Sequence, residues 1–170
     1  SGVGRVVATI IPVSRRRRRG QHCDRPRMSG HRPSKVGHAL PEVVRLVTQE
    51  RVNAYADAAD DHNPIHLDPV FAARTQFGRR IAHGMLTLAF VAEMMARGFP
   101  DTWHSGGRLK VRFKAPVFPG DVVTAFGEVT AISPSPGGPV AKCRVGLRRA
   151  DGEEAVSGQA WALIGQQAPV

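Results

Sequence analysis

Cysteine and long apolar runs are both scarce in this chain of 170 residues. Its two cysteines, Cys23 and Cys143, are too few for a disulfide framework, so we expect a cytoplasmic protein with reduced thiols. No apolar run approaches the roughly 20 residues that cross a bilayer, so we expect no membrane span. The short apolar run over residues 6–13 is followed by five arginines, an order that does not fit a secretory signal peptide.

Acidic residues are almost missing from the first part of the chain. Residues 1–34 carry nine arginines and one acid, Asp24, whereas residues 35–170 carry 15 basic and 13 acidic residues. Residues 1–34 therefore carry +8 of the net charge of +10, and the nearly neutral remainder, at +2, argues against a nucleic-acid-binding protein. We expect a basic, disordered tail over residues 1–34 and one domain over residues 35–170.

Three interpretations of this tail stay open. It is an adhesive arm for RNA or membranes, an Arg-rich transit-like extension, or the product of a start site placed too far upstream, since Met28 lies where a compact domain could begin. Deleting residues 1–27 separates an enzyme, which keeps its activity, from a binding arm, which loses salt-sensitive affinity.

The first half of the domain is dominated by helical patterns. An apolar segment over residues 43–47 predicts a short strand, and Thr48 is a suitable N-cap for a helix over residues 49–59. Asp68 followed by proline is a helix start, which predicts a second helix over residues 69–76.

A buried helix and a set of strands are predicted for the rest. From Gly84 to Met95 the sequence is apolar on nearly all faces, which is typical of a helix surrounded by protein. Alternating or β-rich segments, separated by Pro and Gly turns, predict antiparallel strands over residues 109–113, 122–132, 140–149 and 154–164. One buried helix and a long antiparallel sheet indicate an α+β architecture.

Titratable side chains crowd into residues 57–68, and Asp61 and His66 are the two of greatest interest. Because Pro64 breaks the helix between them, both side chains could turn toward one pocket. An Asp beside a His can hold a water, take its proton and return a proton to a neighbouring atom. Such a pair suits the addition or removal of water across a double bond.

Two other interpretations of this cluster compete with catalysis. Asp, His and Asn after a helix often form only a cap network that satisfies backbone amides. A metal site would use Asp61, His62 and His66, but these lack the usual histidine spacing and have no paired cysteines, so we expect no metal.

The order of the residues in this cluster resembles a known signature. Residues 61–66, DHNPIH, match the Asp, any residue, Asn-Pro, aliphatic, His pattern of the MaoC-like (R)-specific enoyl-CoA hydratases. Residues 81–86, IAHGML, and residues 113–121, FKAPVFPGD, are similar to the start of that family's central helix and to its strand and turn. The resemblance runs from about Gly37 to the last strand. It implies the hot-dog fold, an antiparallel sheet wrapped around one long buried helix.

Carried over position by position, the resemblance implies roles for single residues. Asp61 and His66 match the catalytic pair that binds the water, and the Gly84 N–H matches the donor that meets the thioester carbonyl. Asn63 and His83 are expected to shape the loop and the start of the helix. Three apolar residues are expected to shape the acyl pocket and set the chain length: Phe71, Phe77 and Met85.

The resemblance also implies the activity and the partners. It implies an (R)-specific enoyl-CoA hydratase or (R)-3-hydroxyacyl thioester dehydratase of fatty acid metabolism, a lyase that acts by syn addition or removal of water on short- to medium-chain acyl thioesters. No cofactor is expected, since the CoA or acyl-carrier-protein arm belongs to the substrate, and a homodimer is expected. The alternative is a hot-dog acyl-CoA thioesterase, against which the Asn-Pro-x-His loop argues. One departure is Asp60, where the family often has a short residue, and we expect it to face solvent.

Overall fold

The computed structural model describes residues 5–9 and 33–164 of the chain. The elements in chain order are β1 (Arg5–Thr9), β2 (Val43–Leu46), α1 (Gln49–Ala59), α2 (Pro64–Leu67), α3 (Pro69–Ala73), α4 (Gly84–Gly98), α5 (Trp103–Gly106), β3 (Arg108–Phe113), β4 (Val122–Ser133), β5 (Val140–Arg149) and β6 (Glu154–Leu163). Within the described residues no helix is both long and apolar enough to cross a bilayer.

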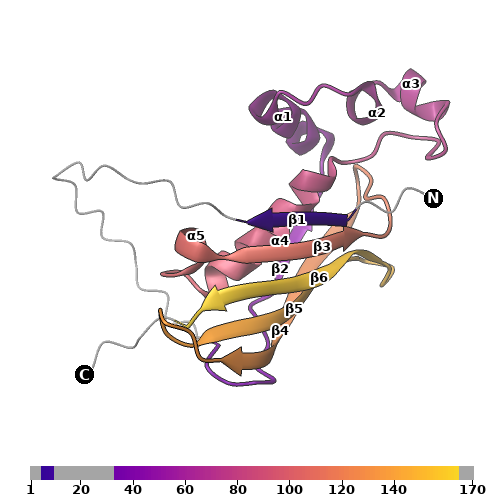
Figure 1. Ribbon diagram of the computed structural model, residues 1–170. Coiled ribbons are helices and arrows are strands. Elements are labelled where there is room, and N and C mark those ends of the chain that lie inside the picture. Colours follow the sequence, from indigo (N-terminus) through magenta and orange to yellow (C-terminus); the bar gives the residue numbers. More distant parts are fainter. Residues whose placement is uncertain (1–4, 10–32, 165–170) are drawn as a thin grey trace, which may run out of the picture.

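The strands form one six-stranded sheet in the order β1-β3-β6-β5-β4-β2, and every neighbouring pair is antiparallel. Figure 1 shows the sheet passing over α4, with α1, α2 and α3 gathered beside the start of that helix. The β5–β6 hairpin turns at Asp151 and Gly152, and Gly152 has a φ of 88°, a conformation that glycine adopts without strain. The predicted turn between these two strands is therefore confirmed.

The core lies between α4 and the inner face of the sheet. Val91, Met94 and Met95 of α4 are fully buried, and Leu109 and Val111 of β3 face them because alternate residues of a strand point to the same side. Burial of each such side chain stabilises the fold by about 1.5–3 kcal/mol. This α+β hot-dog arrangement, with one buried helix against an antiparallel sheet, confirms the prediction.

The helix starts follow the predicted caps. The Thr48 side chain accepts a hydrogen bond from the Arg51 N–H at 3.3 Å and begins α1. The Asp68 side chain accepts from the Val70 and Phe71 N–H groups and begins α3. However, α3 ends at Ala73 instead of running to Gln76, because the Thr75 hydroxyl bonds back to the Ala72 carbonyl and competes with the helical pattern.

The structure differs from the predicted disordered tail at residues 5–9. These residues form β1, which pairs with β3 in a register that runs from Arg5 opposite Arg112 to Thr9 opposite Arg108. The free edge of β3 offers unpaired backbone groups, and the β-branched and small residues of the segment suit a strand. The remaining tail expectations, including the start at Met28, lie outside the described residues.

Candidate active site

Two tight turns bring Asp61 and His66 together beside the start of α4. Helix α1 ends at Asp60, which adopts the left-handed conformation with a φ of 53°, and the Asp61 N–H then bonds back to the Ala56 carbonyl. The Asn63 side chain accepts from the Ile65 N–H and starts α2. A carboxylate oxygen of Asp61 and a ring nitrogen of His66 consequently lie within 4.8 Å of each other. One water molecule can bridge two groups at such a separation.

The backbone fixes the orientation of the His66 ring. Its Nδ1 lies 2.8 Å from the Ile81 carbonyl oxygen, which can only accept, so Nδ1 carries the hydrogen. In the neutral ring, Nε2 then keeps a lone pair. Burial lowers the pKa of His66, the hydrogen bond to Ile81 partly opposes this effect, and nearby His83 lowers the pKa further. A neutral His66 with an unprotonated Nε2 can accept a proton from a bound water.

His83 lies beneath this pair and touches both members. It is 98% buried, and its Nε2 donates to the Asp61 backbone carbonyl at 3.0 Å. Its ring centroid is 3.8 Å from that of His66, and Tyr55 packs on it with a centroid distance of 4.9 Å. The sequence analysis placed His83 at the start of the helix, and the structure has it there, just before Gly84. Its contact with His66 could not be predicted, because the two residues are 17 positions apart and no local pattern links them.

Three residues of this cluster could hold a metal ion, namely Asp61, His66 and His83. The predicted set contained His62 in place of His83. The structure puts His62 on the surface, where its Nε2 is 3.1 Å from Asp57 Oδ1. Each buried imidazole already gives one nitrogen to a backbone carbonyl, so each has one nitrogen left for any ligand.

Gly84 begins α4 at the wall of a cleft of about 220 Å³. The N–H groups of the first helical turn have no acceptor within the helix, so they can serve a ligand in the cleft. A Cβ atom at Gly84 would lie 3.2 Å from the Phe113 ring, which is tighter than ordinary contact. Glycine at this position thus avoids crowding the Phe113 ring at the start of α4.

The cleft walls come from three separate segments of the chain. His66, Phe77 and Gly84 are predicted site residues that line the cleft. Phe71 and Met85, also predicted, are each 46% exposed on the surface and are not among the cleft-lining residues. The expectation that they shape the acyl pocket stays a prediction. Sequence reasoning missed several lining residues, namely Ile81, Ala82, Thr87, Phe113, Lys114, Ala115, Pro116 and Val117.

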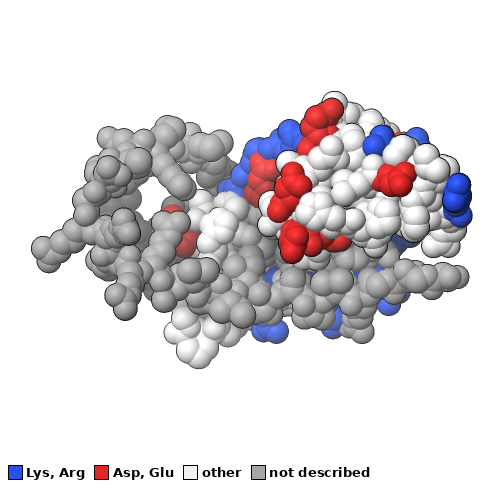
Figure 2. Space-filling model, turned by 90° about the horizontal axis from the view of Figure 1, so that it is seen from above, with Lys and Arg blue, Asp and Glu red and all other residues white. Residues whose placement is uncertain are grey.

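Acidic and basic side chains are both exposed on α1, α2, α3 and the turns beside them. Figure 2 shows them on the face that α1, α2 and α3 form, and the exposed acids there include Glu50, Asp57, Asp60, Asp61 and Asp68. The Asp60 side chain is fully exposed, as predicted, so it does not enter the cleft.

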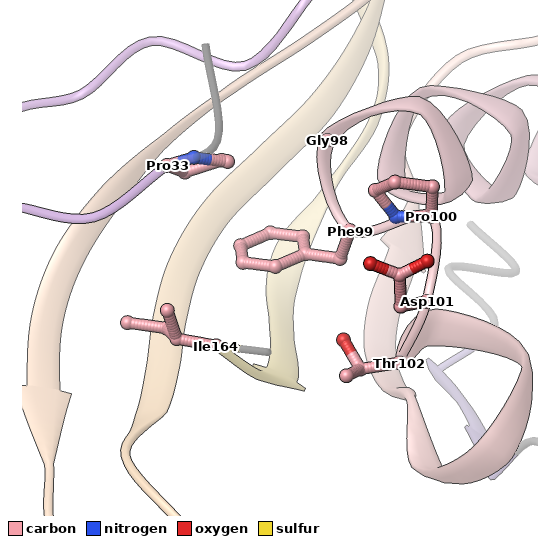
Figure 3. A pocket seen from close by; sticks show the side chains of 7 residues that line it. All are labelled: Pro33, Gly98, Phe99, Pro100, Asp101, Thr102 and Ile164. Atoms are coloured by element: carbon pink, nitrogen blue, oxygen red, sulfur yellow. The ribbon is translucent and has the colours of Figure 1, made fainter. Parts of the chain in front are cut away.

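A second hollow, shown in Figure 3, lies at the far end of α4. It is lined by Phe99 and Ile164 among others and has a volume of about 10 Å³. Helix α4 has 15 residues, which at about 1.5 Å each separate this hollow from Gly84 by about 20 Å. It takes no part in the cluster around His66.

Comparisons with known proteins identify a family and several relatives of this chain. Residues 35–137 match the family model described as MaoC like domain. Over 109 residues the chain is 39% identical to an (R)-specific enoyl-CoA hydratase of Aeromonas caviae, covering 64% of this chain and 80% of that one. Over 98 residues it is 33% identical to a mitochondrial 3-hydroxyacyl-[acyl-carrier-protein] dehydratase of Arabidopsis thaliana, covering 58% of this chain and 57% of that one.

The fold is also shared with solved structures. The structure of the (R)-hydratase from A. caviae involved in PHA biosynthesis superposes with a TM-score of 0.67 and 34% identity, over 78% of this chain and 98% of that one. The family model covers more than half of the chain and includes Asp61, His66 and Gly84. The chain therefore belongs to the MaoC-like domain family.

Proposed function

We propose that this protein is an (R)-specific enoyl-CoA hydratase or (R)-3-hydroxyacyl thioester dehydratase. One observation carries the proposal: the carboxylate of Asp61 and the ring of His66 lie within 4.8 Å of each other, beside a cleft that begins at Gly84. A water held by this pair would stand beside a substrate whose carbonyl meets the free N–H groups of α4. The names of the relatives support the same chemistry.

In the hydration direction, the water bound by Asp61 and His66 attacks the β-carbon of the trans-2-enoyl thioester. His66 Nε2 takes a proton from the water, and the electrons of the double bond move toward the thioester carbonyl. The Gly84 N–H and the positive end of α4 stabilise the charge on that oxygen. The proton then passes from His66 to the α-carbon on the same face. One water thus supplies both the hydroxyl group and the new hydrogen, and dehydration is the reverse.

The partners follow from the same proposal. We propose a homodimer, since Asp61 is exposed in the single chain and a second copy would shelter the cleft mouth. CoA or an acyl carrier protein supplies the arm of the substrate, so no further cofactor is needed for this chemistry. A cytoplasmic location stays a prediction.

The activity is tested with crotonyl-CoA and purified protein. Loss of the ultraviolet absorbance of the conjugated thioester, without release of free thiol, supports the hydratase, and chiral analysis of the product tests the R assignment. Release of free thiol with the absorbance change would instead make the protein a thioesterase, because water would then attack the carbonyl carbon. Neither change with crotonyl-CoA, longer enoyl-CoAs or carrier-bound enoyl groups would overturn the proposal.

The rate is expected to fall in acid with a midpoint below pH 6.5. His66 must be neutral to accept a proton, and burial holds its pKa below the ordinary value of 6.5. Acid is expected to lower the stability of the fold as well as the rate. Because the unfolded chain binds this proton more readily than the folded chain, the contribution of His66 to stability is complete above pH 6.5. It is lost as the pH falls toward the lower pKa of the folded state. The check is kcat/KM against pH together with an NMR titration of His66. A His66 midpoint above 6.5 would contradict the assignment.

Removal of residues 1–27 is expected to leave the crotonyl-CoA activity unchanged within about twofold. Among the described residues, the deletion takes away β1, which pairs with the edge strand β3, and no residue that lines the cleft. It also uncovers the β3 edge, so the fraction of dimer at a given concentration should rise. Sedimentation and kinetics of the shortened chain check both parts, and loss of most activity on deletion would show that the tail belongs to the site.

A further inference from the structure

The outer face of the sheet carries a groove of about 510 Å³ that the proposed reaction does not use. Two strands form its walls, and both present cations to solvent. Among the residues that line the groove, β3 supplies Lys110 and Arg112 and β5 supplies Arg144. Arg108 of β3 and Lys142 of β5 continue the same two walls just beyond the lining residues.

The floor of the groove is β6, which lies between these two strands. Gln159 stands opposite Lys110 on one side and Arg144 on the other, and Ser157 stands opposite Arg112. The lining residues Ser157, Gly158 and Gln159 of the floor are uncharged, and Glu154 at the start of β6 is an acid that also lines the groove. Two strand spacings of about 4.8 Å place the cationic walls about 10 Å apart.

Three of the wall cations have no acidic partner within the described part of the chain. Arg144 pairs with Glu128 at 3.3 Å, but Lys110, Arg112 and Lys142 make no ion pair with any described residue. Cations along one face produce a positive potential that attracts an anionic partner and increases its association rate.

The dimensions of the groove suit one kind of occupant. An α-helix with side chains is about 10–12 Å wide, close to the separation of the walls. From Arg108 to Arg112 the wall extends over about 13 Å, which matches rather more than two helical turns. Acidic side chains at helical spacing on such a segment would reach cations on both walls.

The groove meets the active-site cleft at one ion pair. Glu154 lines the groove, Lys114 lines the cleft, and their charged groups are 2.9 Å apart. A partner held in the groove would therefore stand beside the cleft mouth. We propose that the groove docks an acidic helix of the protein that carries the acyl thioester, an inference that rests on the proposed function and names a carrier protein as the substrate donor.

The test compares two substrates with one triple variant, Lys110→Gln, Arg112→Gln and Lys142→Gln. With the crotonyl group on an acidic acyl carrier protein, kcat/KM should fall about tenfold, since three solvent-exposed charge contacts are lost. With crotonyl-CoA it should change less than about twofold. The matched control, Lys35→Gln, Arg51→Gln and Arg74→Gln, removes three exposed cations from other surfaces and should affect neither substrate.

A binding measurement separates failure of the groove from failure of the enzyme. Fluorescence anisotropy of the labelled carrier protein should show weaker binding to the triple variant than to wild type and the control, even if no substrate is turned over. Equal binding by all three proteins would overturn the docking proposal and leave the hydratase proposal intact. Loss of single-stranded RNA binding in the triple variant, with carrier binding unchanged, would overturn it in favour of a nucleic-acid surface.

Discussion

Replacing Asp61 by Asn, or His66 by Ala, is expected to lower kcat for crotonyl-CoA hydration by about 10²–10⁴-fold, the range for loss of a general acid–base group. Asp61→Asn keeps the size of the side chain but removes the negative charge that orients the water. His66→Ala removes the one ring nitrogen that is free to take a proton, since the other is bonded to Ile81. Absorbance kinetics on the three proteins measure both effects.

His62→Ala is the matched control for this pair. His62 lies on the same loop, but its contacts are to Asp57 and Asp60 on the surface, so its loss should change kcat less than about twofold. The comparison requires similar melting temperatures for all variants, so that a loss of rate is not caused by unfolding. If the Asp61 and His66 variants keep more than about a tenth of the wild-type rate, these residues form only a cap network.

Gly158→Ala is expected to give the largest loss of stability, about 3 kcal/mol, from a single methyl group. Gly158 lies in β6 between Val111 of β3 and Val145 of β5. A Cβ atom there would lie 2.2 Å from the Lys110 carbonyl oxygen and 2.8 Å from the Val111 Cα. Because these are backbone atoms, no side chain can rotate away, and β3 must separate from β6.

For a chain of this length, such a loss corresponds to a decrease in melting temperature of about 10 °C. Gly106→Ala is the control, because Gly106 has nothing within 4 Å of its Cβ position and no left-handed φ. It should change the free energy of unfolding by less than about 0.5 kcal/mol. Equal melting temperatures for Gly158→Ala and wild type would show that the two strands are not packed as described.

The fold could be predicted from the sequence wherever a local pattern of residues determines the structure of that same segment. The predicted strand over residues 140–149 has the same bounds as β5, because inward and outward residues alternate along it. The apolar stretch after Gly84 forms α4, as predicted, because a segment that is apolar on nearly all helical faces favours a buried helix. The pair of Asp61 and His66 was also predictable, since only five positions separate the two residues.

Features that depend on contacts between distant segments could not be read in this way. Pro64 was taken only as a helix breaker, yet proline is well suited to a first helical position and begins α2. Strand β1 forms because β3 offers an edge, which the tail sequence does not reveal. Phe71 was expected to shape the pocket, and in the single chain it is 46% exposed and does not line the cleft. Side-chain direction follows from how the helices pack, and no local pattern reports it.

The burial of Cys143 bears on how the protein tolerates its own substrate. An α,β-unsaturated thioester is an electrophile that thiolates attack at the same β-carbon that receives water. Cys143 is fully enclosed in β5, and burial raises the pKa of its thiol to about 12, so almost none of it is thiolate at neutral pH. The residues that line the cleft include no cysteine. Within the described residues, an enoyl group in the cleft would therefore meet no reactive thiol.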